Sequence, residues 1–447
     1  MSGTRRRGDG PMVWGGRAGG GAVRALGVIA LLLAWLTPCS ASARDAPPSG
    51  DTREIFERYS DRVVQIRVVE AASGAKAATG SGFAVEAGGR VITNYHVISQ
   101  VIQHPERYRA QLVAGDEEPH PLKILAFDVV HDLALVASEI TFDQVFTLGD
   151  VDLRKGRRIY SLGNPYELGL SIVEGTYNGL LEHSRYSRIH FTGSLNPGMS
   201  GGPAIVESGQ VVGVNVSTAG DQVSFLVPAE RVRELLARTH ASGFEPVSDY
   251  TEELRRQLTL YQEEYLSDIL VKAPELVRLG HYEAPTQLAP QFNCWGDTLQ
   301  EDDDLFQGLS HECFTEDRIY ISEEQGFSLV QLRHRQLDSS KLSPARFYEL
   351  YSAYFEDNSS ELWGTEEDYT AFRCNTRFVA NATLHMKATL CVRRYRKLAG
   401  LYDAVLKAAA LGNDDEGFET ALVLSGVSFA NAERVARAYL ESIAWKP

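Results

Sequence analysis

The chain has 447 residues, which at about 100–200 residues per domain indicates two or three domains. Hydrophobic residues make up 44% of it and charged residues 23%, a globular composition that excludes bulk disorder. With 44 basic and 59 acidic side chains, the chain carries a formal net charge of −15. Because binding to nucleic acid needs a concentrated basic face, we expect no nucleic-acid partner.

The N-terminal segment has the pattern of a secretory signal peptide over residues 1–43. Several arginines, the last of them Arg24, precede an uncharged apolar run at 25–36, and a small-x-small cleavage pattern follows at 41–43. Because this run is shorter than the roughly 20 residues of a spanning helix, we prefer a cleaved leader over a retained anchor. The expected protein is exported, periplasmic or secreted, and has no membrane contact after cleavage.

Residues 51–240 form the first predicted domain after the leader. A short helix is expected to open at Asp51, and another is expected over 229–238. Between them, short β-rich runs alternate with Gly-rich turns, at 63–69, 82–85, 90–93, 133–136, 158–162, 210–216 and 223–227. Many short strands with almost no helix indicate an all-β barrel or sandwich.

Three segments of this domain carry side chains suited to nucleophilic catalysis. They are VITNYHV (91–97), a strand ending in a polar turn that presents His96; HDLALV (131–136), which contains Asp132; and NPGMSGGP (196–203), which contains Ser200. A serine hydroxyl needs a base to take its proton, and a carboxylate orients the imidazole that does so. The chain order His, Asp, Ser is the order of chymotrypsin-like proteases. Asp128 is the alternative carboxylate, but only Asp132 directly precedes the apolar strand.

The glycines around Ser200 fit a second requirement of acyl transfer. A tetrahedral oxyanion needs two backbone N–H groups aimed at one point, in a bend that glycine tolerates. We expect the N–H groups of Gly198 and Ser200 to form this oxyanion hole.

Four segments together resemble the trypsin-fold serine proteases, and most closely their HtrA/Deg-like branch: residues 80–97, 148–153, 161–169 and 196–203. The resemblance covers about residues 53–238. It implies a mainly β, double β-barrel (chymotrypsin-like) fold in which His96, Asp132 and Ser200 are the catalytic residues.

The same resemblance implies a primary specificity pocket with Ser194 at its floor. A neutral floor offers no partner for Arg or Lys, and Phe225 with the strand near Ser217 would restrict the pocket to small or medium apolar side chains. Two features depart from the family. Met199 stands where relatives have Asn or Asp, so activation through a salt bridge to a freed N-terminus is not expected. Residues 244–447 show no PDZ-like segment.

Residues 244–447 form the second predicted domain. The boundary between the two domains contains Gly243 and Pro246, which are typical of a linker. Helical spacing indicates helices over 250–270, 344–355 and 431–443, and strand-like runs lie at 318–321, 327–332, 372–379, 383–394 and 418–429. This α+β pattern resembles no family that we identify. Binding of substrates, blocking of the active site and simple stabilisation are all compatible with it.

Four of the five cysteines lie in the second domain: Cys294, Cys313, Cys374 and Cys391. An even number of cysteines in an exported chain indicates two disulfides. We prefer the local pairs Cys294–Cys313 and Cys374–Cys391 among the three connectivities, with four buried free thiols as the alternative. No C-x-x-C motif is present, so neither a zinc site nor a thioredoxin-type motif is expected. Triad chemistry needs no metal or nucleotide, so we expect no cofactor.

These features predict an exported serine endopeptidase that acts through a His-Asp-Ser triad and an acyl-enzyme intermediate, with a role in protein quality control. Its expected partners are protein or peptide substrates, in particular unfolded ones, and an oligomer is compatible with the sequence. The alternative is a catalytically silent trypsin-fold chaperone or binding scaffold.

Overall fold

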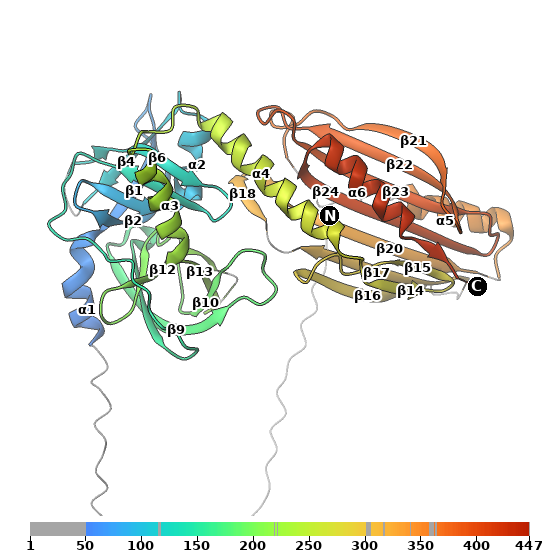
Figure 1. Ribbon diagram of the computed structural model, residues 1–447, viewed down its shortest axis with the longest axis horizontal. Coiled ribbons are helices and arrows are strands. Elements are labelled where there is room, and N and C mark those ends of the chain that lie inside the picture. The colour runs from blue at the N-terminus through green and yellow to red at the C-terminus, as the bar shows by residue number, and fades with distance from the viewer. Residues whose placement is uncertain are drawn as a thin grey trace, which may run out of the picture. The chain divides into compact units, whose positions relative to one another are not determined.

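The computed structural model describes residues 51–446 except for 115–117, 219, 221, 301–304, 316–317, 340, 357–361 and 363. The leader predicted over 1–43 lies outside the described residues. Those described belong to a single compact unit, drawn as a ribbon in Figure 1. In this part of the chain, no helix is both long and apolar enough to span a membrane.

Seven antiparallel strands build the first sheet, in the order β5-β4-β1-β2-β3-β7-β6. Helix α1 (Thr52–Tyr59) precedes the sheet, and the carboxylate of Asp51 caps it by accepting a hydrogen bond from the N–H of Arg53. The strands are β1 (Val63–Glu70), β2 (Lys76–Glu86), β3 (Arg90–Thr93), β4 (Tyr108–Val113), β5 (His120–Pro121), β6 (Lys123–Asp128) and β7 (Leu133–Ala137).

Six further strands form a closed barrel in the order β10-β13-β12-β11-β8-β9. They are β8 (Arg158–Gly163), β9 (Ser171–Leu180), β10 (Ile189–Thr192), β11 (Pro203–Ile205), β12 (Val211–Thr218) and β13 (Ser224–Pro228). Helix α3 (Ala229–Ala241) follows and buries Val232 and Leu235. The first sheet and this barrel give the mainly β, two-barrel architecture expected of a chymotrypsin-like domain.

Helix α2 (Tyr95–Gln103) is the main departure from the elements expected in this region. We expected a polar turn after β3 to present His96, and this expectation was wrong because His96 lies in the first turn of a helix. Asn94, a residue type favoured at helix N-caps, precedes the helix. The buried residues Val97, Ile98 and Val101 then follow helical spacing, which sets the helix against the sheet.

The described residues from 250 onward fold as an α+β domain around a second antiparallel sheet, in the order β16-β17-β20-β24-β23-β22-β21. Its strands are β16 (Phe292–Gln300), β17 (Gln307–Thr315), β20 (Val330–Asp338), β21 (Arg373–Ala380), β22 (His385–Arg394), β23 (Tyr402–Leu411) and β24 (Glu416–Val427). Two smaller sheets accompany it. In one, β15 (Tyr282–Pro285) lies between β14 (Leu276–Leu279) and β25 (Ala444–Trp445); in the other, β18 (Ile319–Ser322) pairs with β19 (Gln325–Phe327).

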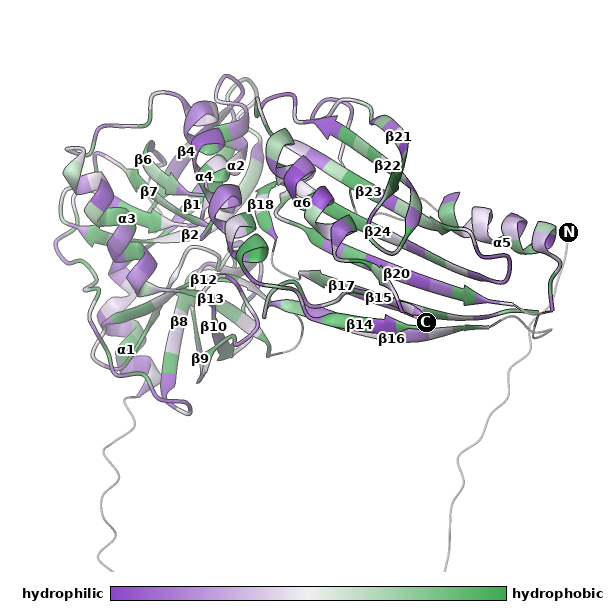
Figure 2. Ribbon diagram, turned by 45° about the vertical axis from the view of Figure 1, so that its right-hand side comes forward, coloured by the Kyte–Doolittle hydropathy of each residue, from purple (hydrophilic) through white to green (hydrophobic). Residues whose placement is uncertain are grey.

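Three helices accompany this sheet: α4 (Tyr250–Val271), α5 (Pro344–Glu356) and α6 (Phe429–Glu441). Helix α6 lies across the face of the sheet, where it packs on β23 and β24 (Figure 1). It mixes polar residues with apolar ones (Figure 2), and its apolar residues Val435 and Tyr439 are buried. This is the arrangement of an amphipathic helix covering a sheet.

One hydrophobic cluster joins the first sheet to the α+β domain. It contains Ile66 on β1, Ile98 on α2, Leu254 and Leu258 on α4, and Ile321 on β18. All five side chains are almost completely shielded from water. The two predicted domains therefore bury apolar surface in a common core.

A buried glutamine adds polar contacts to this joint core. The side-chain amide of Gln257 on α4 donates to the carbonyl of Phe127 at 2.9 Å, and its oxygen accepts from the N–H of Val129 at 3.0 Å. These bonds satisfy two backbone groups at the end of β6 and fix the position of α4 against the first sheet.

Two disulfides cross-link neighbouring strands of the second sheet, with the expected pairing. Cys294 and Cys313 are bonded across β16 and β17, and Cys374 and Cys391 across β21 and β22. The members of each pair are directly opposite one another in strand register. Strand pairing has thus brought each pair of thiols within bonding reach.

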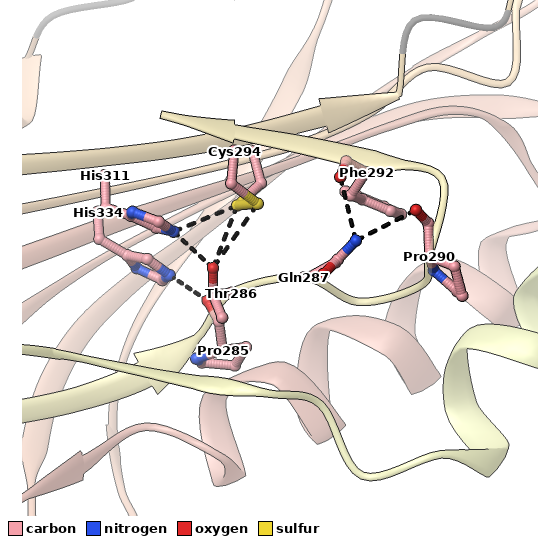
Figure 3. Close-up of a disulfide and its surroundings, with 9 residues drawn as sticks. Pro285, Thr286, Gln287, Pro290, Phe292, Cys294, His311 and His334 are labelled. Atoms are coloured by element: carbon pink, nitrogen blue, oxygen red, sulfur yellow. Dashed lines mark hydrogen bonds between the residues drawn. A yellow bond between two sulfur atoms is a disulfide. The ribbon is translucent and has the colours of Figure 1, made fainter. Parts of the chain in front are cut away.

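A buried histidine lies beside the first disulfide (Figure 3). Nε2 of His334 donates to the carbonyl of Pro285 at 2.6 Å, so Nδ1 is the acceptor for the hydroxyl of Thr420 at 2.9 Å. Both ring nitrogens are therefore satisfied in the neutral form. Burial lowers the pKa of His334 from 6.5 to about 4, although the bond to Pro285 opposes the shift.

This histidine makes stability depend on pH. Between about pH 6.5 and pH 4 the unfolded chain takes up a proton that folded His334 does not, so the free energy of unfolding falls as the pH decreases. The His334 contribution to that fall is about 2 kcal/mol between pH 7 and pH 5. Denaturant unfolding of wild type and His334→Gln at both pH values should show the smaller pH dependence in the variant. Equal pH dependence in the two proteins would contradict the assignment.

Candidate active site

Helix α2 and the turn before β7 bring His96 and Asp132 together. Nδ1 of His96 lies 2.7 Å from Oδ2 of Asp132, and the backbone N–H of His96 donates to Oδ1 at 2.9 Å. The side chain of Asp132 is 10% exposed and that of His96 is 27% exposed. A shielded carboxylate thus fixes both the ring and the backbone of a histidine that still reaches solvent.

The backbone at Asp132 is held in an uncommon conformation. Its φ of +60° lies in the left-handed region, which costs free energy for a residue other than glycine. The buried side chain of Asn94 donates to the carbonyl of Asp132 at 2.7 Å and so helps to hold it there. The hydrogen bond from Asn94 therefore helps to keep the carboxylate of Asp132 directed toward His96.

Asp128, the alternative carboxylate, has other partners. Its Oδ2 lies 3.0 Å from Nδ1 of His131 and 3.0 Å from Nη2 of Arg238. Burial alone would raise the pKa of Asp128, but the hydrogen bonds and charge of His131, aided by Arg238, outweigh burial and lower the pKa to about 2. Asp128 therefore joins α3 to the first sheet, and Asp132 is the carboxylate that contacts His96.

Ser200 lies in the turn that enters β11, on the closed barrel. Its hydroxyl donates to the carbonyl of Val216 at 3.1 Å. Ser200 and His96 are both among the described residues, and no hydrogen bond joins them. In structures without substrate such catalytic bonds are often long or absent, and a serine hydroxyl changes rotamer rapidly. The structure thus brings His96 and Asp132 together, and it places Ser200 on a separate loop that packs on β2.

That loop is packed directly against the strand leading to His96. Gly201 has a φ of +86°, and a Cβ at this position would lie 2.2 Å from the carbonyl oxygen of Ser81 and 2.4 Å from the hydroxyl of Thr93. Only glycine allows this approach. This turn, residues 196–203, is called the nucleophile turn after the predicted role of Ser200, and it packs on β2 and on the last residue of β3.

Ser81 is a supporting residue that sequence reasoning missed. Its buried hydroxyl donates to the carbonyl of Gly198 at 2.7 Å and accepts from the N–H of Asn164 at 2.8 Å. Its own N–H donates to the carbonyl of Ser200 at 2.7 Å. One serine of the first sheet thus orients two peptide groups of the nucleophile turn. Its position in the GSG at 80–82 was the available signal.

The N–H groups expected to form the oxyanion hole are available for a ligand. Among the described residues, no protein acceptor is bonded to the N–H of Gly198 or of Ser200. The N–H of Tyr166 donates to the carbonyl of Pro197 at 2.9 Å. Because the N–H of a trans peptide points away from its carbonyl, this bond turns the N–H of Gly198 to the opposite side.

Met199, the departure from the family pattern, has a packing role. Its side chain is 1% exposed and belongs to an apolar cluster with Phe191 and Leu195. Its carbonyl accepts from the side-chain amide of Asn215 at 3.2 Å. The buried side chain of Met199 thus anchors the nucleophile turn in this apolar cluster.

Two of the residues expected around the specificity pocket face one another on neighbouring strands. Phe225 on β13 is opposite Ser217 on β12 and opposite His190 on β10. Phe225 is half-buried, Ser217 is exposed, and the rings of Phe225 and His190 lie 6.5 Å apart. Sequence reasoning missed His190 because β10 was not among the predicted strands.

Ser194, the expected pocket floor, is exposed just after β10. Its neighbours are fixed by the buried hydroxyl of Ser224, which donates to the carbonyl of Gly193 at 2.7 Å and accepts from the N–H of Leu195 at 3.3 Å. The segment that leads into the nucleophile turn is therefore tied to β13.

One group of described side chains in the second sheet has metal-binding character. Atoms of Cys294, His311 and Cys313 lie within 4.8 Å of one another (Figure 3). Zinc binds cysteine as thiolate, and both sulfurs are bonded to each other. In the oxidised protein this group therefore lacks its sulfur ligands.

The sequence of the first domain is similar to known serine proteases. Residues 80–214 match the family model of the trypsin-like peptidase domain. Serine protease HTRA1 of Xenopus tropicalis is 29% identical over 174 residues, which cover 37% of this chain and 36% of that protein. Serine protease HTRA4 of Homo sapiens is 32% identical over 178 residues, which cover 36% of this chain and 35% of that protein.

Mitochondrial serine protease HTRA2 of Bos taurus is 28% identical over 219 residues, 44% of this chain and 46% of that protein. The chain thus spans between about a third and a half of the length of these relatives. Among solved structures, that of Deg5 has 28% sequence identity and a TM-score of 0.36, and the match covers 41% of this chain and 90% of Deg5.

The two carboxylates give a matched pair of variants. Asp132→Asn should slow the reaction of Ser200 with a fluorophosphonate probe by about three to four orders of magnitude, because the histidine loses the partner that fixes its tautomer. Asp128→Asn should keep the wild-type labelling rate but lower the free energy of unfolding by about 2 kcal/mol, because it weakens charge-assisted hydrogen bonds to His131 and Arg238. The reverse pattern would show that Asp128 is the functional carboxylate.

Proposed function

We propose, from the premise that residues 80–214 form a trypsin-like peptidase domain related to the HtrA serine proteases, that this chain is a serine endopeptidase. The observation that carries the proposal is the shielded 2.7 Å contact between His96 and Asp132. Beside it stands a glycine-flanked Ser200, and within the described part of the chain the N–H groups of Gly198 and Ser200 have no protein acceptor. A catalytically silent scaffold would not need this contact.

In the proposed reaction, the hydroxyl oxygen of Ser200 attacks the peptide carbonyl while Nε2 of His96 takes its proton. Asp132 holds Nδ1–H and stabilises the imidazolium that forms. The N–H groups of Gly198 and Ser200 bind the oxyanion of the tetrahedral intermediate. His96 then gives the proton to the leaving amine, and water hydrolyses the acyl-enzyme by the same steps in reverse order.

We extend the proposal to substrate and compartment. Proteolysis acts on unfolded or locally opened segments, so unfolded proteins in quality control are the proposed substrates. The signal-peptide pattern at 1–43 and the two disulfides support export to the periplasm or the exterior.

Removal of the nucleophile tests the chemistry. Ser200→Ala should lower the rate of casein cleavage by roughly a millionfold, to below detection, because the covalent step is lost while binding remains. In wild-type digests, mapped cleavage sites should follow small or medium apolar residues, because Ser194 provides no charge for Arg or Lys. Equal cleavage by both proteins would reject the protease and favour the scaffold, and sites dominated by Arg and Lys would reject the pocket assignment.

Export is tested by N-terminal sequencing of the protein purified from its native host. The first residue should be Arg44, because cleavage is expected after the A-S-A pattern. A chain that begins upstream with the leader intact would contradict the cleaved-leader proposal and support a retained anchor.

A further inference from the structure

The β18–β19 hairpin of the α+β domain lies against helix α2, the helix that carries His96. The hydroxyl of Tyr95 donates to the carbonyl of Ile321 on β18 at 3.0 Å, and Tyr95 is completely buried. Residues 95 and 96 are adjacent in the first turn of the helix. The hairpin is therefore anchored one residue away from the proposed general base.

Alternation along β18 turns one aromatic side chain toward that base. Ile319 and Ile321 are 2% and 0% exposed and belong to the joint core, so their positions are fixed by packing. Tyr320 lies between them and is only half-buried, the alternation that is usual along a strand. Its ring centroid lies 5.9 Å from that of His96, at an interplanar angle of 75°.

This edge-to-face geometry is a favourable one for a pair of aromatic rings. Among the residues that the structure describes, the imidazole of His96 has one side-chain hydrogen bond, between Nδ1 and Asp132. The ring of Tyr320 lies beside the imidazole, and the burial of Ile319 and Ile321 restrains the backbone that carries this ring. The polar backbone of the same turn is fixed as well, because the hydroxyl of Ser99 donates to the carbonyl of His96 at 2.9 Å.

We propose that Tyr320 is a positioning residue for His96, supplied by the α+β domain, which keeps the imidazole in the orientation that pairs it with Asp132. The proposal rests on the proposed protease function and deepens it. It gives the α+β domain a part in the chemistry of the first domain, through the β18–β19 hairpin that packs on α2.

Substitutions at this position separate positioning from substrate binding and from simple stabilisation. Tyr320→Ala and Tyr320→Leu should each lower kcat on a short peptide by roughly three- to tenfold, the range expected for loss of an aromatic pair. KM should stay unchanged, because Tyr320 acts on His96 and not on substrate. Tyr320→Phe should restore kcat to within about twofold of wild type, because it keeps the ring.

The measurement needs correction for folding and a matched control. Active-site titration with a fluorophosphonate probe gives the concentration of competent enzyme, so a partly unfolded variant does not appear slow. The leucine variant keeps apolar volume if the alanine variant unfolds. Tyr348→Ala removes a partly exposed tyrosine on α5 of the same domain and should keep the wild-type kcat.

Several results would overturn the inference. They are a wild-type kcat in Tyr320→Ala and Tyr320→Leu, a rise in KM at constant kcat, and a loss in Tyr320→Phe as large as in Tyr320→Ala. The last would assign the effect to the hydroxyl. Failure of the proposed function has a different signature, because wild type would then be as inactive as Ser200→Ala, and the inference would fall with it.

Discussion

The first turn of α2 is the constraint on which the site depends, because two adjacent residues there face different parts of the molecule. Tyr95 is buried in the joint core and binds the backbone of β18, while His96 turns to Asp132 and remains partly exposed. Burial of Val97, Ile98 and Val101 holds the helix against the sheet. The position of the imidazole is thus determined by the packing of a whole helix as well as by one hydrogen bond.

The nucleophile turn is also held by the first sheet, through contacts with β2 and β3. Ser81 orients the peptide groups of Gly198 and Ser200, and Gly201 allows the turn to approach Thr93. Side chains and backbone of β2 and β3 therefore set the relation between the two halves of the site. Preorganised donors of this kind need little rearrangement when charge develops on a substrate.

Local motifs in the sequence were enough to indicate His96, Asp132 and Ser200 and the two-barrel fold. Their catalytic roles stay predictions. We chose Asp132 over Asp128 because an apolar strand directly follows Asp132. In the structure the carboxylate of Asp128 is instead bonded to His131 and Arg238. The cysteine pairing was also accessible, because each pair closes a short loop between paired strands.

Other features depend on contacts between distant residues, for which the sequence has no local signal. Strand β23 reads YDAVLKAAAL, whose alanines favour helix by propensity, yet it lies between β22 and β24 as a central strand. The hydroxyl of Ser81 acquires its role only when residues 81, 164 and 198 meet. The contact of Tyr320 with His96 joins segments more than 200 residues apart and requires the joint core.

The most direct test of the account is to locate the covalent adduct after the folded, full-length protein reacts with a fluorophosphonate. Peptide mapping by mass spectrometry should find a single modified residue, Ser200, because the proposed mechanism gives this hydroxyl a base in His96 and an oxyanion site in the N–H groups of Gly198 and Ser200. An adduct on a different serine, or no adduct on a protein that still cleaves casein, would contradict the assignment of the site.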